Sequence, residues 1–287
     1  MRSLTVSLLN INQAQLTINL LNQLACLSAE DWAVQLIWVD NGSHDDQVRQ
    51  LSGWFLANKE RFAEALFVTA SRNLGADGGR NIAFKVASHD RILILDNDII
   101  LPDDAAWLGT LWQRMENDPQ IGIVGPMLVS AGYPDIVEGT GIGLTDRGRV
   151  GYLNRAQPVA YIPPTLVEVV AMPSACWLVR RQAQQTIGLL SDEYYPMQYA
   201  DVDFCVRLGL AGWKIVCDRS VRIKHMGNVT TRSLEGQPYT RVAVRHGMIF
   251  REKWANILPQ IAMISEDDIY WGPIPRTDKG SPVTHEI

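Results

Sequence analysis

The first hundred residues alternate between short apolar runs and segments with helical periodicity. Four mostly aliphatic runs have the length and composition of strands buried on both faces: Leu4–Leu9, Val34–Val39, Leu66–Thr69 and Arg91–Leu95. Helical spacing of apolar residues appears twice, in Leu16, Leu20, Leu24 and Leu27 and, within Gly79–Ser88, in Ile82, Ala83 and Val86. This order of elements predicts a parallel sheet with crossover helices, which binds ligands at the carboxyl ends of its strands.

After Asp98 the pattern changes to a mixture of helices, hairpins and isolated strands. We expect helices at Trp107–Met115, stopped by Asn117-Asp118-Pro119, and at Ala200–Leu210. Extended segments are predicted at Ile121–Val124, Val167–Val179, Lys214–Val216 and Val221–Lys224. Glycine-rich residues 132–151 favour hairpins, and the last twenty or so residues, rich in proline, favour a loose tail.

Composition narrows the class of protein. A chain of 287 residues can hold one large α/β domain or two fused halves. The net charge of −5 argues against a surface that binds nucleic acid throughout. The four cysteines lack CxxC spacing and are expected to be small core residues in a reducing compartment. Without a signal peptide or a spanning apolar segment, we expect a cytoplasmic protein, with peripheral contact at the inner membrane face left open.

Two polar segments follow predicted strands. Asp40-Asn41-Gly42-Ser43 follows the second strand, where an acidic side chain can accept from a nucleobase N–H or a ribose hydroxyl; a simple Asn-Gly turn is the alternative. The segment from Arg72 to Asn81 follows the third strand and combines three glycines, two arginines and a helix start, which suits a diphosphate. A flexible loop with a helix cap explains it equally well.

Asp96-Asn97-Asp98 ends the fourth predicted strand. Two carboxylates at this position are costly unless a cation accompanies them, and oxygen ligands favour Mg²⁺ or Mn²⁺. Asp201 begins a predicted helix, where it either faces a cleft or caps the helix. His225 ends a strand and is either a further metal ligand or a hydrogen-bonded core residue.

Taken together, these segments resemble the inverting family 2 glycosyltransferases, in particular the rhamnosyltransferase-like branch. The likeness runs from about residue 3 to about residue 255. The residues that carry it are Asn10 and Asn12, Val39–Ser43, Asn73–Gly75, Gly79–Asn81, Leu95–Asp98 with Pro102-Asp103, Ala175–Arg181, Asp201–Asp203 with Arg207, and His225. The resemblance implies a GT-A fold in which a mostly parallel nucleotide-binding sheet is fused to a mixed acceptor-binding region.

The resemblance also implies roles for residues. Asp98 and His225 would hold Mn²⁺ or Mg²⁺, and Asp201 would be the general base of a single inverting displacement. The nucleotide-sugar would be bound by Asn10, Asn12, Asp40, Arg72, Asn73, Gly75, Gly79, Arg80, Asp96 and Asn97. Residues 1–100 would form the donor half, 101–228 the acceptor and catalytic half, and 229–287 a C-terminal helical segment and tail.

The chain departs from the family pattern at two positions. Ala200 precedes Asp201 where the family usually has glutamate, which puts the acceptor geometry in question, and Ser174 stands where glycine is common. The implied reaction transfers a sugar from a UDP- or dTDP-sugar to a glycan, lipid-linked or small-molecule acceptor in polysaccharide or glycoconjugate synthesis, without nucleic acid.

Near the C-terminus, four basic residues share a stretch with two aromatic ones, Phe250 and Trp254. We favour a solvated helix with its aromatics turned inward over a basic face for a lipid-linked acceptor. Two alternatives to the transferase remain. A nucleotidyltransferase would need a glycine-rich loop after the first strand, which Asn10–Leu16 does not provide. A non-catalytic nucleotide-sugar-binding protein would not need Asp98, Asp201 and His225 together.

Overall fold

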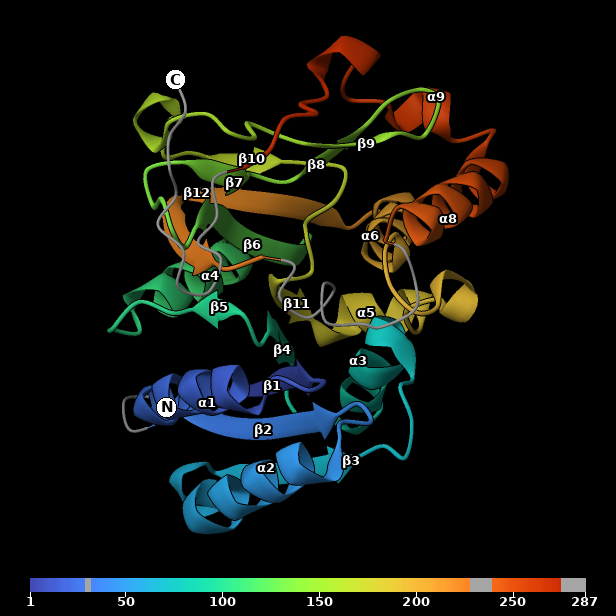
Figure 1. Ribbon diagram of the computed structural model, residues 1–287. Helices are drawn as coiled ribbons and strands as arrows, with labels where there is room; N and C mark the ends of the chain where they lie inside the picture. Colours follow the sequence, from blue (N-terminus) through green and yellow to red (C-terminus); the bar gives the residue numbers. More distant parts are fainter. Residues whose placement is uncertain (29–31, 228–238, 275–287) are drawn as a thin grey trace.

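The computed structural model of the protein describes residues 1–28, 32–227 and 239–274, and its core is one ten-stranded sheet (Figure 1). The strand order is β10-β12-β6-β11-β4-β1-β2-β3, with β5 on β12 and β7 on β6. The sheet runs without a break through residues 1–100 and 101–228, so the two predicted halves share it.

The first four predicted strands are confirmed as parallel neighbours: β1 Arg2–Asn10, β2 Trp32–Asp40, β3 Glu64–Thr69 and β4 Arg91–Asp96. Asn10 pairs with Asp40, and Leu9 with Asp96, so the polar strand ends meet at one edge. β3 is an exception to the expected burial, because it lies at the edge of the sheet and is partly exposed.

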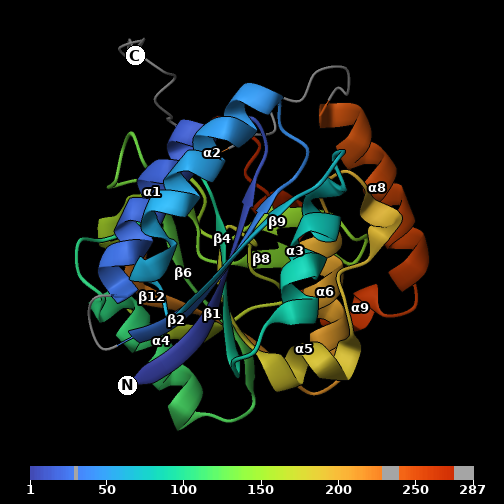
Figure 2. The ribbon, with the colours of Figure 1, turned by 90° about the horizontal axis from the view of Figure 1, so that it is seen from below.

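Two layers of helices cover the sheet (Figure 2). α1 Ala14–Ser28, α2 Asp45–Asn58 and α4 Ala106–Asn117 pack on one face; α3 Gly75–Val86, α5 Arg181–Ile187 and α6 Ala200–Leu210 pack on the other. Strand residues alternate between the layers, as a pleated strand requires: Leu93 and Leu95 face the first, Ile92 and Ile94 the second.

The second half of the sheet is mixed. β11 Cys176–Arg180 is antiparallel to both β4 and β6 Ile121–Ser130 and joins the parallel groups. The two short strands predicted after Lys214 are one strand, β12 Lys214–His225, whose register on β6 shifts between Asp218 and Arg222. Despite this irregularity, β12 pairs with β6 on both sides of the shift and ends at the same edge of the sheet as β4.

The predicted hairpins are confirmed as short strands: β7 Val137–Gly139 pairs with β6, and β8 Ile142–Leu144 pairs with β9 Val150–Tyr152. Of the extended segment Val167–Val179, only its ends are strands, in β10 Leu166–Glu168 and β11. β5 Ile99–Ile100 follows the Asp-Asn-Asp segment. Short 3₁₀ turns complete the set: η1 Lys59–Arg61, η2 Val159–Tyr161, η3 Asp192–Tyr194 and η4 Glu266–Asp268.

Three local predictions are wrong. The helix expected within Gly79–Ser88 is α3, which begins at Gly75. Its buried residues include Phe84, whereas Val86 is exposed. Cys26 is exposed on α1, unlike the three other cysteines. The tail begins later than expected, since Ile269 and Ile274 are buried; residues 275–287 lie outside the described residues.

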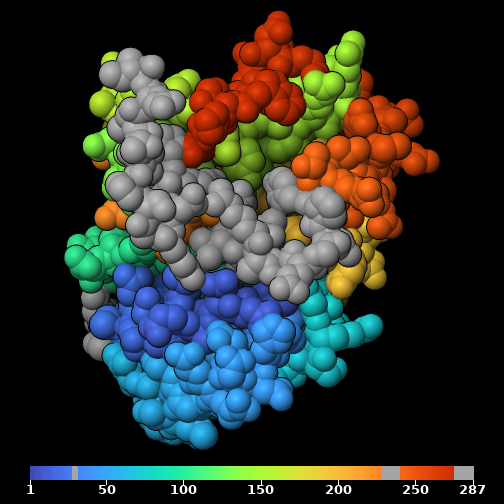
Figure 3. Space-filling model, in the orientation of Figure 1, coloured from blue at the N-terminus to red at the C-terminus, as the bar shows by residue number. Residues whose placement is uncertain are grey.

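The C-terminal elements are α8 Tyr239–Trp254 and α9 Leu258–Ile261. Beyond them the chain lies against the β8–β9 hairpin: Met263 donates its backbone N–H to Leu144, and Glu266 pairs with Arg149. In the space-filling view this red C-terminal segment covers the green hairpin region (Figure 3). Among the described residues no helix has the length and apolar character needed to cross a bilayer.

Candidate functional site

A cavity of about 440 Å³ opens where the polar ends of β1, β4 and β12 meet the N-termini of α3 and α6. The predicted site residues that line it are Asn10, Asn73, Arg80, Asp96, Asn97, Asp98, Asp201 and His225. Five others lie outside the lining: Asn12, Asp40, Arg72, Gly75 and Gly79. Most of the predicted residues are thus brought together, although segments as far apart in the chain as Asn10 and His225 contribute to the cavity.

Asp96, Asp98 and His225 form the acidic centre of the cavity. One ligand atom from each lies within 4.8 Å of the others. His225 Nε2 is 3.2 Å from Asp98 Oδ1, and Asp98 is buried whereas Asp96 is about one-third exposed. Two carboxylates and an imidazole are a donor set suited to Mn²⁺ or Mg²⁺, so these residues fit the expected metal.

Glu138 on β7 is a residue that the sequence analysis missed. Its Oε2 lies 3.0 Å from His225 Nδ1, on the opposite side of the ring from Asp98. Burial lowers the pKa of His225, but the charges of Asp98 and Glu138 outweigh it and raise that pKa well above its ordinary value. A carboxylate on the second ring nitrogen orients a metal-binding histidine, and here it fixes Nε2 toward Asp98.

Arg80 lies on α3 and reaches the same centre. Its Nη2 donates to Asp96 Oδ1, and its side chain is 9% exposed. Burial lowers the pKa of Arg80, but the charges of Asp96 and Asp77 raise it by more, so the net shift of this pKa is upward. The guanidinium is therefore a permanent positive charge beside the two aspartates.

Asp201 is at the start of α6 and also faces the cavity. Its Oδ1 accepts from the backbone N–H of Val202 at 2.9 Å, and its Oδ2 lies 3.4 to 3.5 Å from the backbone nitrogen and hydroxyl of Ser174. Burial raises the pKa of this carboxyl, against the attraction of Arg80. Ser174 thus contacts Asp201 through a hydroxyl that glycine would lack. Ala200, the residue before Asp201, also lines the cavity.

Asp40 lies behind the cavity wall. It is fully buried, and it accepts hydrogen bonds from Asn10 Nδ2 at 2.7 Å and from both the hydroxyl and the backbone N–H of Ser43. Ser43 Oγ in turn accepts from the backbone of Asn12. In this structure Asp40 orients Asn10, which lines the cavity, and its contact with a base stays a prediction.

The glycine-rich segment achieves close packing of α3. Gly75 has φ +79°, and a Cβ there would lie 2.9 Å from the Tyr195 ring; a Cβ on Gly79 would lie 2.2 Å from Leu9 Cδ1. Asn41, which lines the cavity although it was not among the predicted site residues, donates to Asn73 Oδ1 and to the carbonyl of Gly75. The segment therefore positions the start of α3 through its packing, while Arg72 is exposed to solvent.

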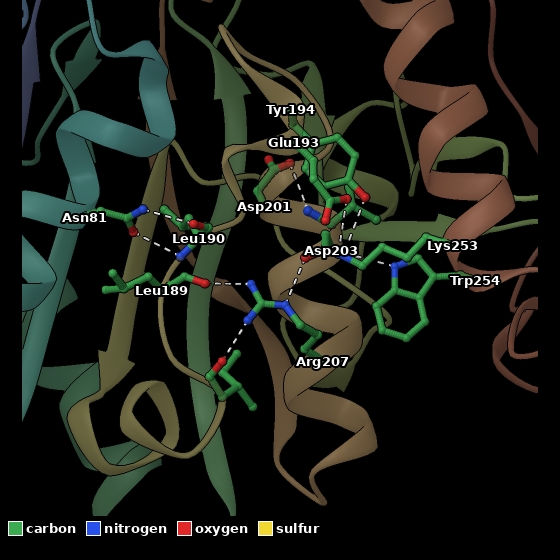
Figure 4. Close-up of polar contacts among 12 residues, drawn as sticks. Asn81, Leu189, Leu190, Glu193, Tyr194, Asp201, Asp203, Arg207, Lys253 and Trp254 are labelled. Atoms are coloured by element: carbon green, nitrogen blue, oxygen red, sulfur yellow. Dashed lines mark hydrogen bonds and ion pairs between the residues drawn. The ribbon is translucent and has the colours of Figure 1, made fainter.

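A second polar cluster holds α6 in place (Figure 4). Asp203 is fully buried, and it accepts from Arg207 Nε at 2.9 Å, Lys253 Nζ at 2.9 Å and Trp254 Nε1 at 3.0 Å. Arg207 also donates to two backbone carbonyls before η3. We call Asp203, Arg207, Lys253, Trp254 and Tyr194 the Asp203 cluster. Its contacts join α8 to α6.

The preferred interpretation of the basic C-terminal stretch is confirmed for its aromatic residues. Phe250 is fully buried, and Trp254 belongs to the Asp203 cluster through its hydrogen bond to Asp203. Lys253 pairs with Asp203, whereas Arg241 and Arg245 are exposed.

The described part of the cavity lining also includes Tyr152 and Trp271, which the sequence analysis did not identify because neither lies in a recognisable motif.

Comparison with solved structures places the fold. GalNAc-T7, solved with UDP, GalNAc and Mn²⁺, aligns with a TM-score of 0.66 and 13% identity over 90% of this chain and 50% of its own. The mannosyltransferase PcManGT from Pyrobaculum calidifontis, in complex with GDP-Man and Mn²⁺, aligns with a TM-score of 0.55 and 14% identity over 91% and 71%. TarS 1–349 from S. aureus also gives 0.55 and 14%, over 93% and 68%. The GT-A fold is confirmed.

Two curated relatives match parts of the chain. The O-antigen biosynthesis protein RfbC of Myxococcus xanthus is 27% identical over 53% of this chain and 12% of its own length. The uncharacterized protein y4gI of Sinorhizobium fredii is 25% identical over 77% of this chain and 24% of its own. The chain thus spans a quarter or less of the relatives that it matches. The model of glycosyl transferase family 2 matches residues 14–183, more than half of the chain, and the protein belongs to that family.

Proposed function

We propose that this protein transfers a sugar from a nucleoside diphosphate to an acceptor hydroxyl, with inversion at the anomeric carbon. One observation carries the proposal: a single cavity contains both a metal-type donor set, Asp96, Asp98 and His225, and a separate, half-buried carboxylate, Asp201. A metal-bound diphosphate and a general base are the two components that direct displacement of a nucleotide requires.

The leaving diphosphate would be held by Asp98 and His225 through a divalent cation, with Asp96 alongside. When bound, Mn²⁺ or Mg²⁺ would neutralise the charge that develops on the leaving oxygen. Arg80 adds a fixed positive charge at the same place, and its ion pair with Asp96 keeps the guanidinium pointed at the acidic centre. The Mn²⁺ in the GalNAc-T7 and PcManGT structures supports this assignment.

Asp201 would remove the proton from the acceptor hydroxyl as its oxygen attacks the anomeric carbon. The bond to the new oxygen forms while the bond to the diphosphate breaks, so one displacement inverts the configuration. A carboxylate with an upward-shifted pKa is a stronger base than an exposed one, because burial favours its protonated form. The hydrogen bond to the Val202 N–H orients the carboxylate.

The nucleotide would lie along the ends of β1 and β2, against Asn10, Asn41 and Asn73. The acceptor would enter past Tyr152 and Trp271, since aromatic side chains provide broad apolar surfaces for sugar rings. A UDP- or dTDP-sugar as donor, and a glycan, lipid-linked or small-molecule acceptor in glycoconjugate synthesis, remain the proposed substrates. The O-antigen biosynthesis role of RfbC supports that class.

A thermal-shift measurement tests the donor site. The melting temperature is recorded with UDP, dTDP and GDP, each with and without Mn²⁺. A ligand at 100 times its Kd that binds only the folded state adds about 2.7 kcal/mol to the free energy of unfolding. We expect a shift that needs both one nucleotide and Mn²⁺ and that disappears in Asp98→Asn.

Asp146→Asn is the matched control, because Asp146 is an exposed carboxylate outside the cavity lining. It should shift like the wild type. If no nucleotide stabilises the wild type in the presence of Mn²⁺, the proposed function is wrong. If a nucleotide binds but no sugar is transferred to any acceptor, the non-catalytic alternative is favoured.

A further inference from the structure

Asp77, in the first turn of α3, is a carboxyl group that the proposed mechanism leaves unused. It lines the cavity, yet the residue is only 3% exposed. Its Oδ2 atom is buried and has no hydrogen-bond partner among the described residues. Arg80 lies one turn further along the same helix, and its Nε is likewise buried without a partner there. Two unsatisfied polar atoms therefore lie on the same side of α3, where a ligand would enter.

An unsatisfied buried carboxyl destabilises the folded protein, because it loses its hydration without gaining a hydrogen bond. Burial raises the pKa of Asp77 to about 8, although Arg80 attracts its charge; Asp201, Asp203 and Asp192 repel it and add to the shift. Near neutral pH the group is largely a carboxylic acid, which can both donate and accept. The presence of this carboxyl group in a buried position is explained if a bound ligand provides the missing hydrogen bond.

The charges around Asp77 indicate which part of a donor it would meet. Asp77 lines the cavity together with Arg80, which lies beside the acidic centre, and Asp201, the proposed base, and the charges of both act on it. The sugar must lie between these two groups, because its anomeric carbon is joined to the diphosphate and is attacked by the acceptor. A sugar hydroxyl, which both donates and accepts, satisfies either protonation state of Asp77, whereas a phosphate would be repelled by the ionised form.

We propose that Asp77 hydrogen-bonds a hydroxyl group of the donor sugar and thereby determines which sugar the protein accepts. The inference rests on the proposed function and deepens it. It predicts a donor with a free hydroxyl toward α3 and discrimination against the analogue that lacks this group, since the loss would leave the buried carboxyl unsatisfied again.

The test separates the sugar from the nucleotide. Isothermal titration in the presence of Mn²⁺ gives the Kd of each diphosphate, UDP, dTDP and GDP, and of UDP-glucose, UDP-N-acetylglucosamine, dTDP-glucose and GDP-mannose. For the nucleotide that binds, the ratio of the Kd of its sugar to the Kd of the diphosphate isolates the contribution of the sugar. Asp77→Ala should raise this ratio about tenfold, the effect of losing one hydrogen bond, and leave the Kd of the diphosphate unchanged.

A second measurement excludes a purely structural role. Because the variant removes a buried carboxyl without a partner, the melting temperature of Asp77→Ala should equal or exceed that of the wild type. Asp77→Asn, which keeps a donor and an acceptor, should recover part of the sugar affinity. Lys85→Ala is the control on the same helix, since Lys85 is exposed and outside the cavity lining, and it should match the wild type.

The outcomes distinguish this inference from the proposed function. If the diphosphates bind and the sugar-to-diphosphate ratio is the same in Asp77→Ala and the wild type, the inference is overturned and the proposed function stands. Equal weakening of diphosphate and sugar also overturns it, because Asp77 would then support the whole pocket. If the wild type binds no diphosphate with Mn²⁺, both fail together.

Discussion

At the scale of single residues, two aspartates of the cavity, Asp77 and Asp201, have different surroundings: Asp77 is buried, and Asp201 is half-buried. Asp201 accepts from a backbone N–H and lies beside Ser174, whereas Asp77 Oδ2 has no partner among the described residues. Burial raises the pKa of both carboxyls. The one with an orienting hydrogen bond suits proton transfer, and the other suits recognition of a hydroxyl.

Replacing Asp201 by asparagine tests the first of these roles. Asn keeps the shape of the side chain and a partner for the Val202 N–H but cannot take a proton, so transfer should fall at least a hundredfold. Binding of the nucleotide with Mn²⁺ should stay within a factor of about three. Product formation with the best acceptor provides the rate, and titration provides the affinity. Near-normal turnover would rule out Asp201 as the base.

Asp77 should also make stability depend on pH. Between the ordinary value of 3.8 and its own pKa of about 8, the folded protein keeps a proton on Asp77 that the unfolded chain has lost. The free energy of unfolding should therefore decrease as the pH rises through this window, by up to about 1.4 kcal/mol per pH unit, and level off above it.

Asp77→Asn cannot titrate and should lack this contribution. The charged groups that face the position, Arg80, Asp201, Asp203 and Asp192, are present in both proteins, so the difference between them isolates Asp77. Urea unfolding at pH 5, 6, 7 and 8 measures it. Parallel curves for the two proteins would show that Asp77 carries no such pKa shift.

The sequence predicted site residues where they fall in motifs, and it missed those whose role comes from the tertiary structure. Asp96 ends β4 and Asp98 lies in the turn directly after it, so their place at the edge of the sheet follows from the order of the parallel strands, and Asp201 lies in the first turn of α6. Glu138 acquires its role from His225, which is 87 residues away in the chain. Asp40 ends a strand, as predicted, but its burial depends on Asn10 and Ser43, which no local pattern reveals.

At the scale of elements, the position of α3 depends on its contact with β1. Gly79 lies against Leu9, and a Cβ at this position would come within 2.2 Å of a Leu9 methyl carbon. The helix carries Asp77 and Arg80 and pairs through Asn81 with the backbone of Leu190, as Figure 4 shows. A shift of α3 would therefore displace one wall of the cavity.

Gly79→Ala should lower the free energy of unfolding by about 1 to 3 kcal/mol, because the added methyl group overpacks the interface with β1. Gly53→Ala is the control: Gly53 is an exposed glycine within α2, with no atom within 4 Å of the added Cβ. It should stabilise the protein by about 0.5 to 1 kcal/mol, through helix propensity. Denaturant unfolding measures the free energy of unfolding of both variants. Equal changes in the two variants would contradict the close packing of α3 against β1.

Strands and helices with strong periodicity were predictable, and their boundaries were less so. α3 starts four residues early because Asn73 Oδ1 accepts from the Gly75 N–H and the carbonyl of Pro196 from Ala76, contacts that periodicity does not detect. The break between the two predicted C-terminal strands corresponds to the irregularity of β12, which stays one strand because β6 pairs with both parts.

At the scale of the whole molecule, the Asp203 cluster connects the C-terminal helix to the helix that carries the proposed base. Its buried carboxylate has partners on both α6 and α8. Removing it would leave the partly buried Arg207 without its charged partner and Lys253 with only the more distant Glu193. We expect Asp203→Ala to lower the free energy of unfolding by about 3 to 5 kcal/mol.

Glu193→Ala is the matched control for this prediction. Glu193 also pairs with Lys253, at 3.5 Å, but its side chain is 49% exposed, so its loss should cost less than about 1 kcal/mol. Denaturant unfolding of both variants measures the difference. If Asp203→Ala were as mild as Glu193→Ala, the cluster would contribute little to the attachment of α8.

The Asp203 cluster also limits where the polypeptide can be cut or recombined. A fragment ending at residue 227 would contain every predicted donor-site residue and the proposed base, yet it would lack Lys253, Trp254 and the buried ring of Phe250. Chimaeras that exchange acceptor specificity between relatives should therefore keep α6 and α8 from the same parent, with the crossover placed after Trp254. The smallest exchangeable unit of this protein is thus larger than the segment that defines its family.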